Sequence, residues 1–132
     1  LGVIKAIKIY SNRKLFFIHK NIDAFDFWGL MEGAKFFIGN SSSGLIETPY
    51  FNLPTINLGR RQKGRVRDVN VVDSTYDISN IEIAIKKALS KKFKKMIKNK
   101  FIFGKGNASE KIFRVVKNIK INKKLIMKKM TY

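Results

Sequence analysis

The residues whose types could do chemistry gather in one run, Gly-Asn-Ser-Ser-Ser-Gly-Leu-Ile-Glu, from residue 39 to residue 47. The apolar residues 36–38 before it predict a short buried strand, and the residues after the serines predict a helix. The first backbone N–H groups of a helix have no partner within the helix, so they favour anions. Ser41, Ser42 and Ser43 would add hydroxyl donors. The run therefore predicts a phosphate-binding corner, called here the serine corner (residues 39–44).

Glu47 follows Ser43 by four residues, so both side chains can share one face of a helix. A carboxylate placed there can accept hydrogen bonds from two neighbouring sugar hydroxyls. Phosphate donors beside a hydroxyl acceptor suggest a nucleoside diphosphate. The serines are equally compatible with simple helix capping, and Glu47 with a first-turn acid that favours the helix dipole. The pattern leaves both interpretations open.

The serine corner departs from two known motifs, the nucleotide-binding P-loop and the nucleophile elbow of esterases. Gly39 and Gly44 have the spacing of a P-loop, but Leu45 stands where its lysine is required. An esterase elbow would need glycine at Ser43. A serine nucleophile also needs a base, and His19 is the only histidine. We therefore interpret the serines as binding groups. No cluster of His, Asp and Glu has metal-ligand spacing, so we expect no metal and no cofactor.

A second polar stretch, Gly-Arg-Arg-Gln-Lys-Gly-Arg-Val-Arg, covers residues 59–67 and is called here the basic loop. Arginines bind phosphate through a planar fork of donors, although most charged runs are solvated turns. His19 at a strand end favours a structural role, and Trp28 fits a packing position on a helix.

The elements around these motifs alternate between strand and helix. The patterns predict strands at residues 15–19, 36–38, 54–58 and 69–72. They predict helices at 2–12, 23–33, 43–48, 79–89 and 91–100, and a last helix marked by the apolar residues from 112 to 119. This order implies a parallel sheet covered by helices on both faces, with ligands at the carboxyl ends of the strands. The serine corner and the basic loop both leave from that edge. Asp23 should cap its helix, Asn52 should adopt a left-handed conformation, and residues 122–132 should form a frayed basic tail.

Composition narrows the class of protein. The 132 residues contain no cysteine, which excludes a disulfide framework and fits the cytoplasm. No apolar run approaches the roughly 20 residues of a membrane span. The net charge of +19 could serve nucleic-acid binding, but it is mostly lysine with few interleaved aromatic residues. We attribute the high charge to a drift in amino-acid composition toward lysine. A nucleic-acid-binding protein is a remote alternative.

Three segments together resemble the C-terminal half of the UDP-N-acetylglucosamine 2-epimerases, especially the hydrolysing branch of the sialic-acid pathway. They are the serine corner with the residues through Pro49, the segment Pro-Thr-Ile-Asn-Leu-Gly-Arg-Arg-Gln-Lys-Gly-Arg from Pro54, and Gly-Lys-Gly-Asn-Ala-Ser-Glu-Lys-Ile from Gly104. The similarity runs from about residue 15 to about residue 119. It implies a Rossmann-like domain, the C-terminal half of the two-domain GT-B arrangement. Residues 1–121 would form the UDP-binding domain.

The resemblance also implies residue roles. Ser41 and Ser42 look like the diphosphate-binding serines, Glu47 like the ribose-binding acid, and Arg61 like a further UDP contact. Asn40, Ser43 and Gly44 would support them.

The implied reaction is elimination of UDP and epimerisation at carbon 2, with water giving N-acetylmannosamine and UDP. A non-hydrolysing epimerase and a GT-B glycosyltransferase remain alternatives. The family resemblance places the acids for proton chemistry in an N-terminal domain, so no catalytic residue is expected in this chain, which looks like an inactive fragment. The full-length protein is expected to be a homo-oligomer. One departure is Lys105, which stands where the family usually has aspartate.

Overall fold

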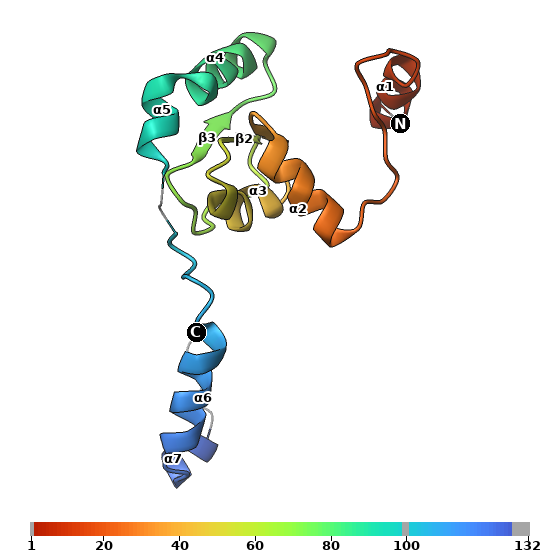
Figure 1. The fold of residues 1–132 in the computed structure, drawn as a ribbon. Coiled ribbons are helices and arrows are strands. Elements are labelled where there is room, and N and C mark those ends of the chain that lie inside the picture. The colour runs from red at the N-terminus through yellow and green to blue at the C-terminus, as the bar shows by residue number, and fades with distance from the viewer. Residues whose placement is uncertain (1, 99–100, 128–132) are drawn as a thin grey trace.

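The structure, a computed structural model, describes residues 2–98 and 101–127. Its centre is a sheet of three parallel strands, β1 (Phe37–Gly39), β2 (Thr55–Leu58) and β3 (Val71–Ser74), in that spatial order (Figure 1). The three carboxyl ends meet at one edge because every pairing is parallel. The predicted parallel α/β sheet is confirmed.

Helices precede the sheet, join β1 to β2 and follow β3, whereas β2 and β3 are joined by a segment without a helix. The helices are α1 (Gly2–Tyr10), α2 (Ala24–Gly33), α3 (Ser43–Ile46), the 3-10 helix η1 (Thr48–Phe51), α4 (Ile78–Leu89), α5 (Lys91–Met96), α6 (Ala108–Asn118) and α7 (Lys123–Ile126). Within the described ranges, each helix is too short or too polar to cross a membrane.

One face of the sheet carries the apolar core. Side chains alternate between the faces of a strand, and Ile56 points to the face covered by α4 and α5. The buried cluster on this face comprises Ile56, Val72, Ala84, Ala88, Phe93 and Ile97. Ala84 and Ala88 let α4 approach the strands closely, and Phe93 and Ile97 of the α5 segment close the cluster.

The opposite face carries α3 and η1. Thr55 is fully buried there, and its hydroxyl lies 2.8 Å from the hydroxyl of Thr48 in η1. The amide of Asn70 donates to the same Thr48 hydroxyl and to the Leu53 carbonyl, both at 2.8 Å. Helix α2 packs outside η1. Helices therefore cover both faces, and the unit is a three-layer, Rossmann-like α/β fold.

One predicted strand is wrong. Residues 15–19 form no strand but an irregular connection from α1 to α2, which runs away from the sheet (Figure 1). Leu15 is 88% exposed and Phe17 is 84% exposed. A continuous apolar run fits a buried strand only when a sheet edge is available to pair with it. His19 accordingly does not lie at a strand end.

Element ends moved by a few residues. The strand predicted at residues 69–72 is β3, two residues later, and the helix predicted at 79–89 is α4, which begins one residue earlier. The predicted helix at 91–100 ends at Met96 in the structure, and residues 99–100 lie outside the described ranges. Two local predictions are confirmed. Asp23 accepts a hydrogen bond from the Phe25 amide at 2.9 Å, and Asn52 has φ 48°.

The two ends of the chain stand apart from the sheet. Helices α1 and α6 contain no buried residue, and in Figure 1 both project away from the central layers. The tail predicted to fray contains α7, and its residues 128–132 lie outside the described part of the chain. The division into a domain at 1–121 and a tail at 122–132 stays a prediction.

Candidate functional site

The serine corner is formed by the turn between β1 and α3. Ser41 is exposed, and its hydroxyl accepts a hydrogen bond from the Ser43 amide at 3.3 Å. The two hydroxyls of Ser41 and Ser43 lie 3.4 Å apart. Ser42 occupies the cap position of α3, yet its side chain makes no capping bond. The Ser41 oxygen therefore accepts from the turn while its O–H remains a donor, and no capping bond accounts for the half-buried Ser42 hydroxyl.

Gly44 holds this turn against the sheet. A Cβ atom at Gly44 would lie 2.8 Å from the Phe37 ring and 3.0 Å from the methyl group of Thr55. These distances are shorter than side-chain packing allows. Gly44 thus sets how closely the first turn of α3 approaches β1 and β2.

Glu47 has a partner that the sequence did not predict. The indole N–H of Trp28, on α2, donates to Glu47 Oε2 at 2.6 Å. Trp28 is 40% exposed and makes an edge-on contact with Phe25, with ring centroids 5.5 Å apart. Glu47 is half-buried, and its second oxygen, Oε1, has no hydrogen bond to a described residue. Trp28 therefore orients the carboxylate through Oε2, and Oε1 is available to accept a hydrogen bond from a ligand.

The basic loop is attached to the serine corner by Gln62. Its side chain is 2% exposed, and its Nε2 donates to the Asn40 carbonyl at 2.6 Å. This bond joins residues 22 apart in sequence and brings the loop after β2 beside the turn after β1. Arg61, the residue before Gln62, is exposed and forms no ion pair within residues 2–98 and 101–127.

A polar network closes the other end of the basic loop. Asn57 on β2 donates to Asp73 Oδ1 on β3 at 2.8 Å, and Arg67 Nη1 lies 2.5 and 2.7 Å from the two Asp73 oxygens. Partial burial works to raise the pKa of Asp73, but the hydrogen bonds from Asn57 and Arg67, with the Arg67 charge, outweigh it. The net effect lowers the pKa of Asp73 below its usual value.

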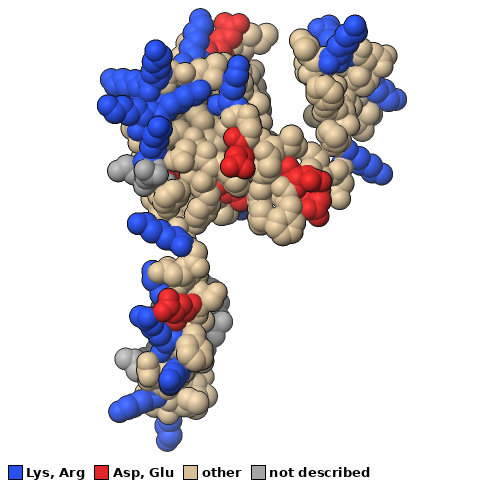
Figure 2. All heavy atoms as spheres, in the orientation of Figure 1, with Lys and Arg blue, Asp and Glu red and all other residues tan. Residues whose placement is uncertain are grey.

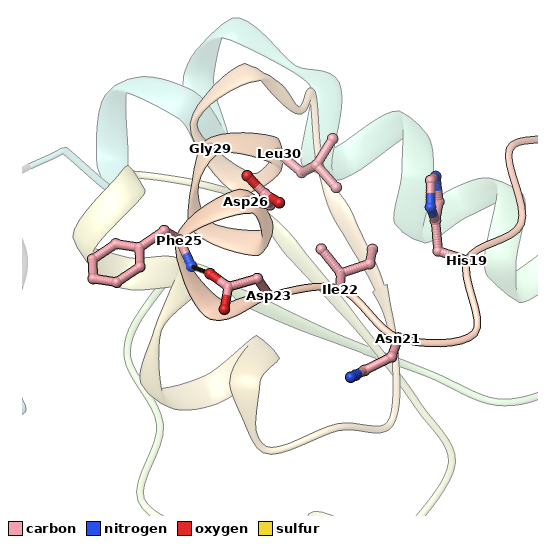
Figure 3. A pocket seen from close by; sticks show the side chains of 8 residues that line it. All are labelled: His19, Asn21, Ile22, Asp23, Phe25, Asp26, Gly29 and Leu30. Carbon is pink, nitrogen blue, oxygen red and sulfur yellow. Dashed lines mark hydrogen bonds between the residues drawn. The ribbon is translucent and has the colours of Figure 1, made fainter.

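His19 lies away from the serines. It lines an open pocket of about 480 Å³ together with Asp23, Asp26 and other residues of α2 and its approach (Figure 3). The dashed bond in Figure 3 is the cap from Asp23 to the Phe25 amide. No serine lines this pocket. His19, the only histidine of the chain, therefore does not share this pocket with the serine corner. No group of three or more His, Cys, Asp or Glu residues in the described ranges is arranged to hold a metal ion.

The Gly-Lys-Gly turn packs beside η1. The Tyr50 and Phe101 rings stack with centroids 5.7 Å apart, and the Tyr50 hydroxyl donates to the Gly104 carbonyl at 3.2 Å. Lys105 lines the shallow pocket at this contact. Gly104 and Gly106 have φ values of 101° and 83°, a region that favours glycine.

The structure thus brings the serine corner, Glu47 and the basic loop to one sheet edge, as the strand order predicted. It adds Trp28 and Gln62, which the sequence did not single out. The position of Trp28 in the sequence predicted only packing on a helix. Gln62 stands among charged residues, and no sequence pattern there indicates a buried amide.

Fold and site together define a Rossmann-like α/β protein with polar groups gathered at the carboxyl edge of its sheet. A family model described as UDP-N-acetylglucosamine 2-epimerase matches residues 3–117. The chain belongs to this family.

Three curated relatives show which members it resembles. It is 47% identical over 74 residues to the GDP/UDP-N,N'-diacetylbacillosamine 2-epimerase (hydrolyzing) of Campylobacter jejuni, covering 56% of this chain and 19% of that protein. It is 32% identical over 115 residues to the UDP-N,N'-diacetylbacillosamine 2-epimerase (hydrolyzing) of Legionella pneumophila, covering 87% and 30%. It is 39% identical over 61 residues to a UDP-N-acetylglucosamine 2-epimerase of Neisseria meningitidis, covering 46% and 16%. The chain therefore spans less than a third of the length of each of these relatives.

Proposed function

We propose that this chain is the UDP-binding part of a hydrolysing 2-epimerase that acts on a UDP-linked acetamido sugar. The observation that carries the proposal is that the Ser42 hydroxyl, which has no hydrogen bond to a described residue, and the basic loop fixed by Gln62 meet at one sheet edge, with the half-open Glu47 carboxylate one helical turn after the serines. Donors for phosphate then stand beside an acceptor for hydroxyls, which is the pairing that a nucleoside diphosphate requires.

Each residue has a defined role in this proposal. Ser41 and Ser42 donate to the diphosphate, supported by the turn of Asn40, Ser43 and Gly44. Glu47 Oε1 accepts from a ribose hydroxyl while Trp28 holds Oε2. Arg61 supplies positive charge to the diphosphate from the basic loop.

The proposed reaction begins with loss of UDP from carbon 1 of the sugar and removal of the proton at carbon 2. Water then adds, and the products are UDP and the 2-epimeric free sugar. UDP is the leaving group, so donors that stabilise its growing negative charge favour bond cleavage. The residues described here hold that leaving group. Proton transfer at carbon 2 is assigned to residues outside this chain, and we expect the chain alone to be inactive.

Two substrates fit the proposal. UDP-N-acetylglucosamine would give N-acetylmannosamine, and the names of the Campylobacter and Legionella relatives support UDP-N,N'-diacetylbacillosamine as the alternative. A longer protein carrying this chain, given each substrate in turn, should release UDP and one free epimerised sugar. Transfer of the sugar to an acceptor would instead indicate a GT-B glycosyltransferase, and conversion to an epimer still bearing UDP would indicate a non-hydrolysing epimerase.

Calorimetric titration of UDP tests the binding site directly. Ser42→Ala and Glu47→Gln should each weaken binding by about tenfold, the loss expected for a hydrogen bond to a charged group. Ser109→Ala and Glu82→Gln are matched controls, because both residues are exposed and form no side-chain bond within the described residues. Equal affinity of the site variants and the wild type would refute the site. Retention on nucleic acid without UDP binding would favour the basic nucleic-acid-binding alternative.

A further inference from the structure

A second cavity lies between the carboxyl ends of β2 and β3. Its volume is about 280 Å³, and its lining residues are Asn57, Gly59, Arg60, Lys63, Arg67 and Asp73. The serine corner follows β1, and β2 lies between β1 and β3. The cavity and the serine corner therefore belong to different strand ends of the same edge.

The cavity has uncompensated positive charge. Arg67 is neutralised by Asp73. Arg60 and Lys63 are exposed and form no ion pair with a residue in the described ranges. Two free cations at the rim of a pocket whose one acid is already paired favour an anionic ligand.

Asn57, one of the residues that line the cavity, has a buried side-chain oxygen without a hydrogen-bond partner among the described residues. Asn57 is 1% exposed, its Nδ2 is committed to Asp73, and its Oδ1 has no hydrogen-bond partner within the described residues. Leaving a buried acceptor unpaired costs free energy. The exposed side chains of Arg60 and Lys63 line the same cavity. A ligand hydroxyl that reaches Asn57 Oδ1 would remove the cost of the unpaired oxygen.

A neighbouring cavity extends the space. It measures about 420 Å³ and shares Gly59, Arg60 and Asp73 with the first. Tyr76 lines this cavity and packs so closely against Gly59 that a Cβ atom there would clash with the Tyr76 hydroxyl. Gly59 also has a φ of 73°, which favours glycine. A flat aromatic ring with a polar tip offers an apolar surface and a hydrogen bond together. The two cavities have room for a phosphate group and a sugar ring.

We propose that this pair of cavities is a second ligand site, which binds a small phosphorylated sugar separately from UDP. The phosphate lies between Arg60 and Lys63, one sugar hydroxyl donates to Asn57 Oδ1, and the ring rests against Tyr76. A sugar phosphate and inorganic phosphate both present an oxyanion to Arg60 and Lys63. The experiment must therefore distinguish these two ligands.

The test is calorimetric titration of the 132-residue chain with glucose 1-phosphate, inorganic phosphate and glucose. It is run at about 150 mM salt so that long-range attraction to the basic surface is screened. Glucose 1-phosphate should bind at least about fivefold more tightly than phosphate or glucose. Lys63→Gln and Arg60→Gln should each weaken it by roughly fivefold, in line with a single screened charge contact. Lys86→Gln removes the same charge from α4 and should leave the affinity unchanged.

Saturating UDP separates this site from the serine corner. Binding of glucose 1-phosphate should persist in its presence, and should also persist in Ser42→Ala. Loss of affinity with UDP would overturn the second site. Equal losses in Lys63→Gln and Lys86→Gln would show non-specific charge attraction and would overturn it as well. Equal affinity for phosphate and glucose 1-phosphate would overturn the assignment to a sugar. If UDP fails to bind but the Lys63 and Lys86 variants behave as stated, the second site stands and the UDP site falls.

Discussion

At the scale of single residues, the carboxylate of Glu47 shows how a partner from another helix can prepare a site. A glutamate rotates freely about three side-chain bonds, and ordering it costs free energy. The Trp28 indole fixes one oxygen at 2.6 Å before any ligand arrives. In the proposed UDP site, part of the ordering cost is therefore met in the free protein.

Trp28→Phe tests this arrangement. The substitution keeps an aromatic ring but removes the indole N–H that donates to Glu47. UDP should therefore bind roughly five- to tenfold more weakly, which corresponds to a loss of about 1 kcal/mol. The measurement is titration with UDP and with 2'-deoxy-UDP. The second ligand has fewer hydroxyls for Glu47, so its affinity should fall less. Equal losses for both ligands would mean that Trp28 does not act through Glu47.

Asp73 predicts a pH dependence of stability. Its pKa is lowered in the folded state, since the Asn57 and Arg67 contacts favour the charged form over the effect of burial. Because the pKa of Asp73 is lower in the folded than in the unfolded protein, its carboxylate stabilises the fold at pH values above the unfolded pKa, near 3.8. This stabilisation is lost as the pH falls through the folded pKa. Urea unfolding at pH 6 and at pH 3 should therefore show a larger loss for wild type than for Asp73→Asn. An equal loss in both proteins would contradict the role of the carboxylate. Glu82→Gln is a useful control, since Glu82 is an exposed acid that forms no side-chain bond within the described residues.

At the scale of elements, the turn from β1 to α3 depends on one missing methyl group. Gly44→Ala would press a Cβ atom against Phe37 and Thr55. We expect a loss of about 1–3 kcal/mol in the free energy of unfolding from overpacking, together with weaker UDP binding as α3 moves off the sheet.

The control substitution, Gly29→Ala, should change the free energy of unfolding in the opposite direction. Gly29 lies inside α2, and a Cβ atom there would meet nothing within 4 Å. Gly29→Ala should stabilise the protein by roughly 0.5–1 kcal/mol because alanine is the better helix former. Chemical denaturation of the two variants compares them directly. A Gly44→Ala protein as stable as wild type would show that α3 has room to shift.

The same elements show what the sequence could and could not predict. From residue 23 to residue 96 the predicted order of strands and helices is confirmed, as are the cap at Asp23 and the left-handed Asn52, because these features depend on local chemistry. The strand predicted at residues 15–19 failed because its apolar pattern is local, while strand pairing needs a neighbour that the pattern does not contain. The bonds of Trp28 and Gln62 join residues 19 and 22 apart, and no local spacing encodes them. The nucleotide contacts themselves stay predictions.

At the scale of the whole molecule, charge and apolar surface are distributed unevenly. Figure 2 shows Lys and Arg side chains gathered over the α4 and α5 region. Helix α6 and the residue that follows it instead expose apolar side chains, those of Ile112, Val115, Val116 and Ile119. An apolar face without a covering element favours association, whereas the net charge of +19 opposes it.

The chain should therefore self-associate more strongly as salt increases, because screening weakens the repulsion between copies. Val116→Glu should reduce this association in sedimentation velocity runs. Ile83→Glu is a matched control, since Ile83 is 63% exposed on α4 and Val116 is 65% exposed on α6. Association that falls with added salt, or that both variants reduce equally, would contradict a role for the α6 face.

The bond from Gln62 to the Asn40 carbonyl also sets an order of events during folding. Each end of this bond follows a strand, and those strands pair across 18 residues, as Phe37 with Thr55. Contacts between distant residues form only after the intervening chain has closed, at a cost in entropy. The basic loop should therefore become ordered late, after β1 and β2 have joined. In pulsed hydrogen exchange, the amides of β2 should gain protection before those of residues 60–65.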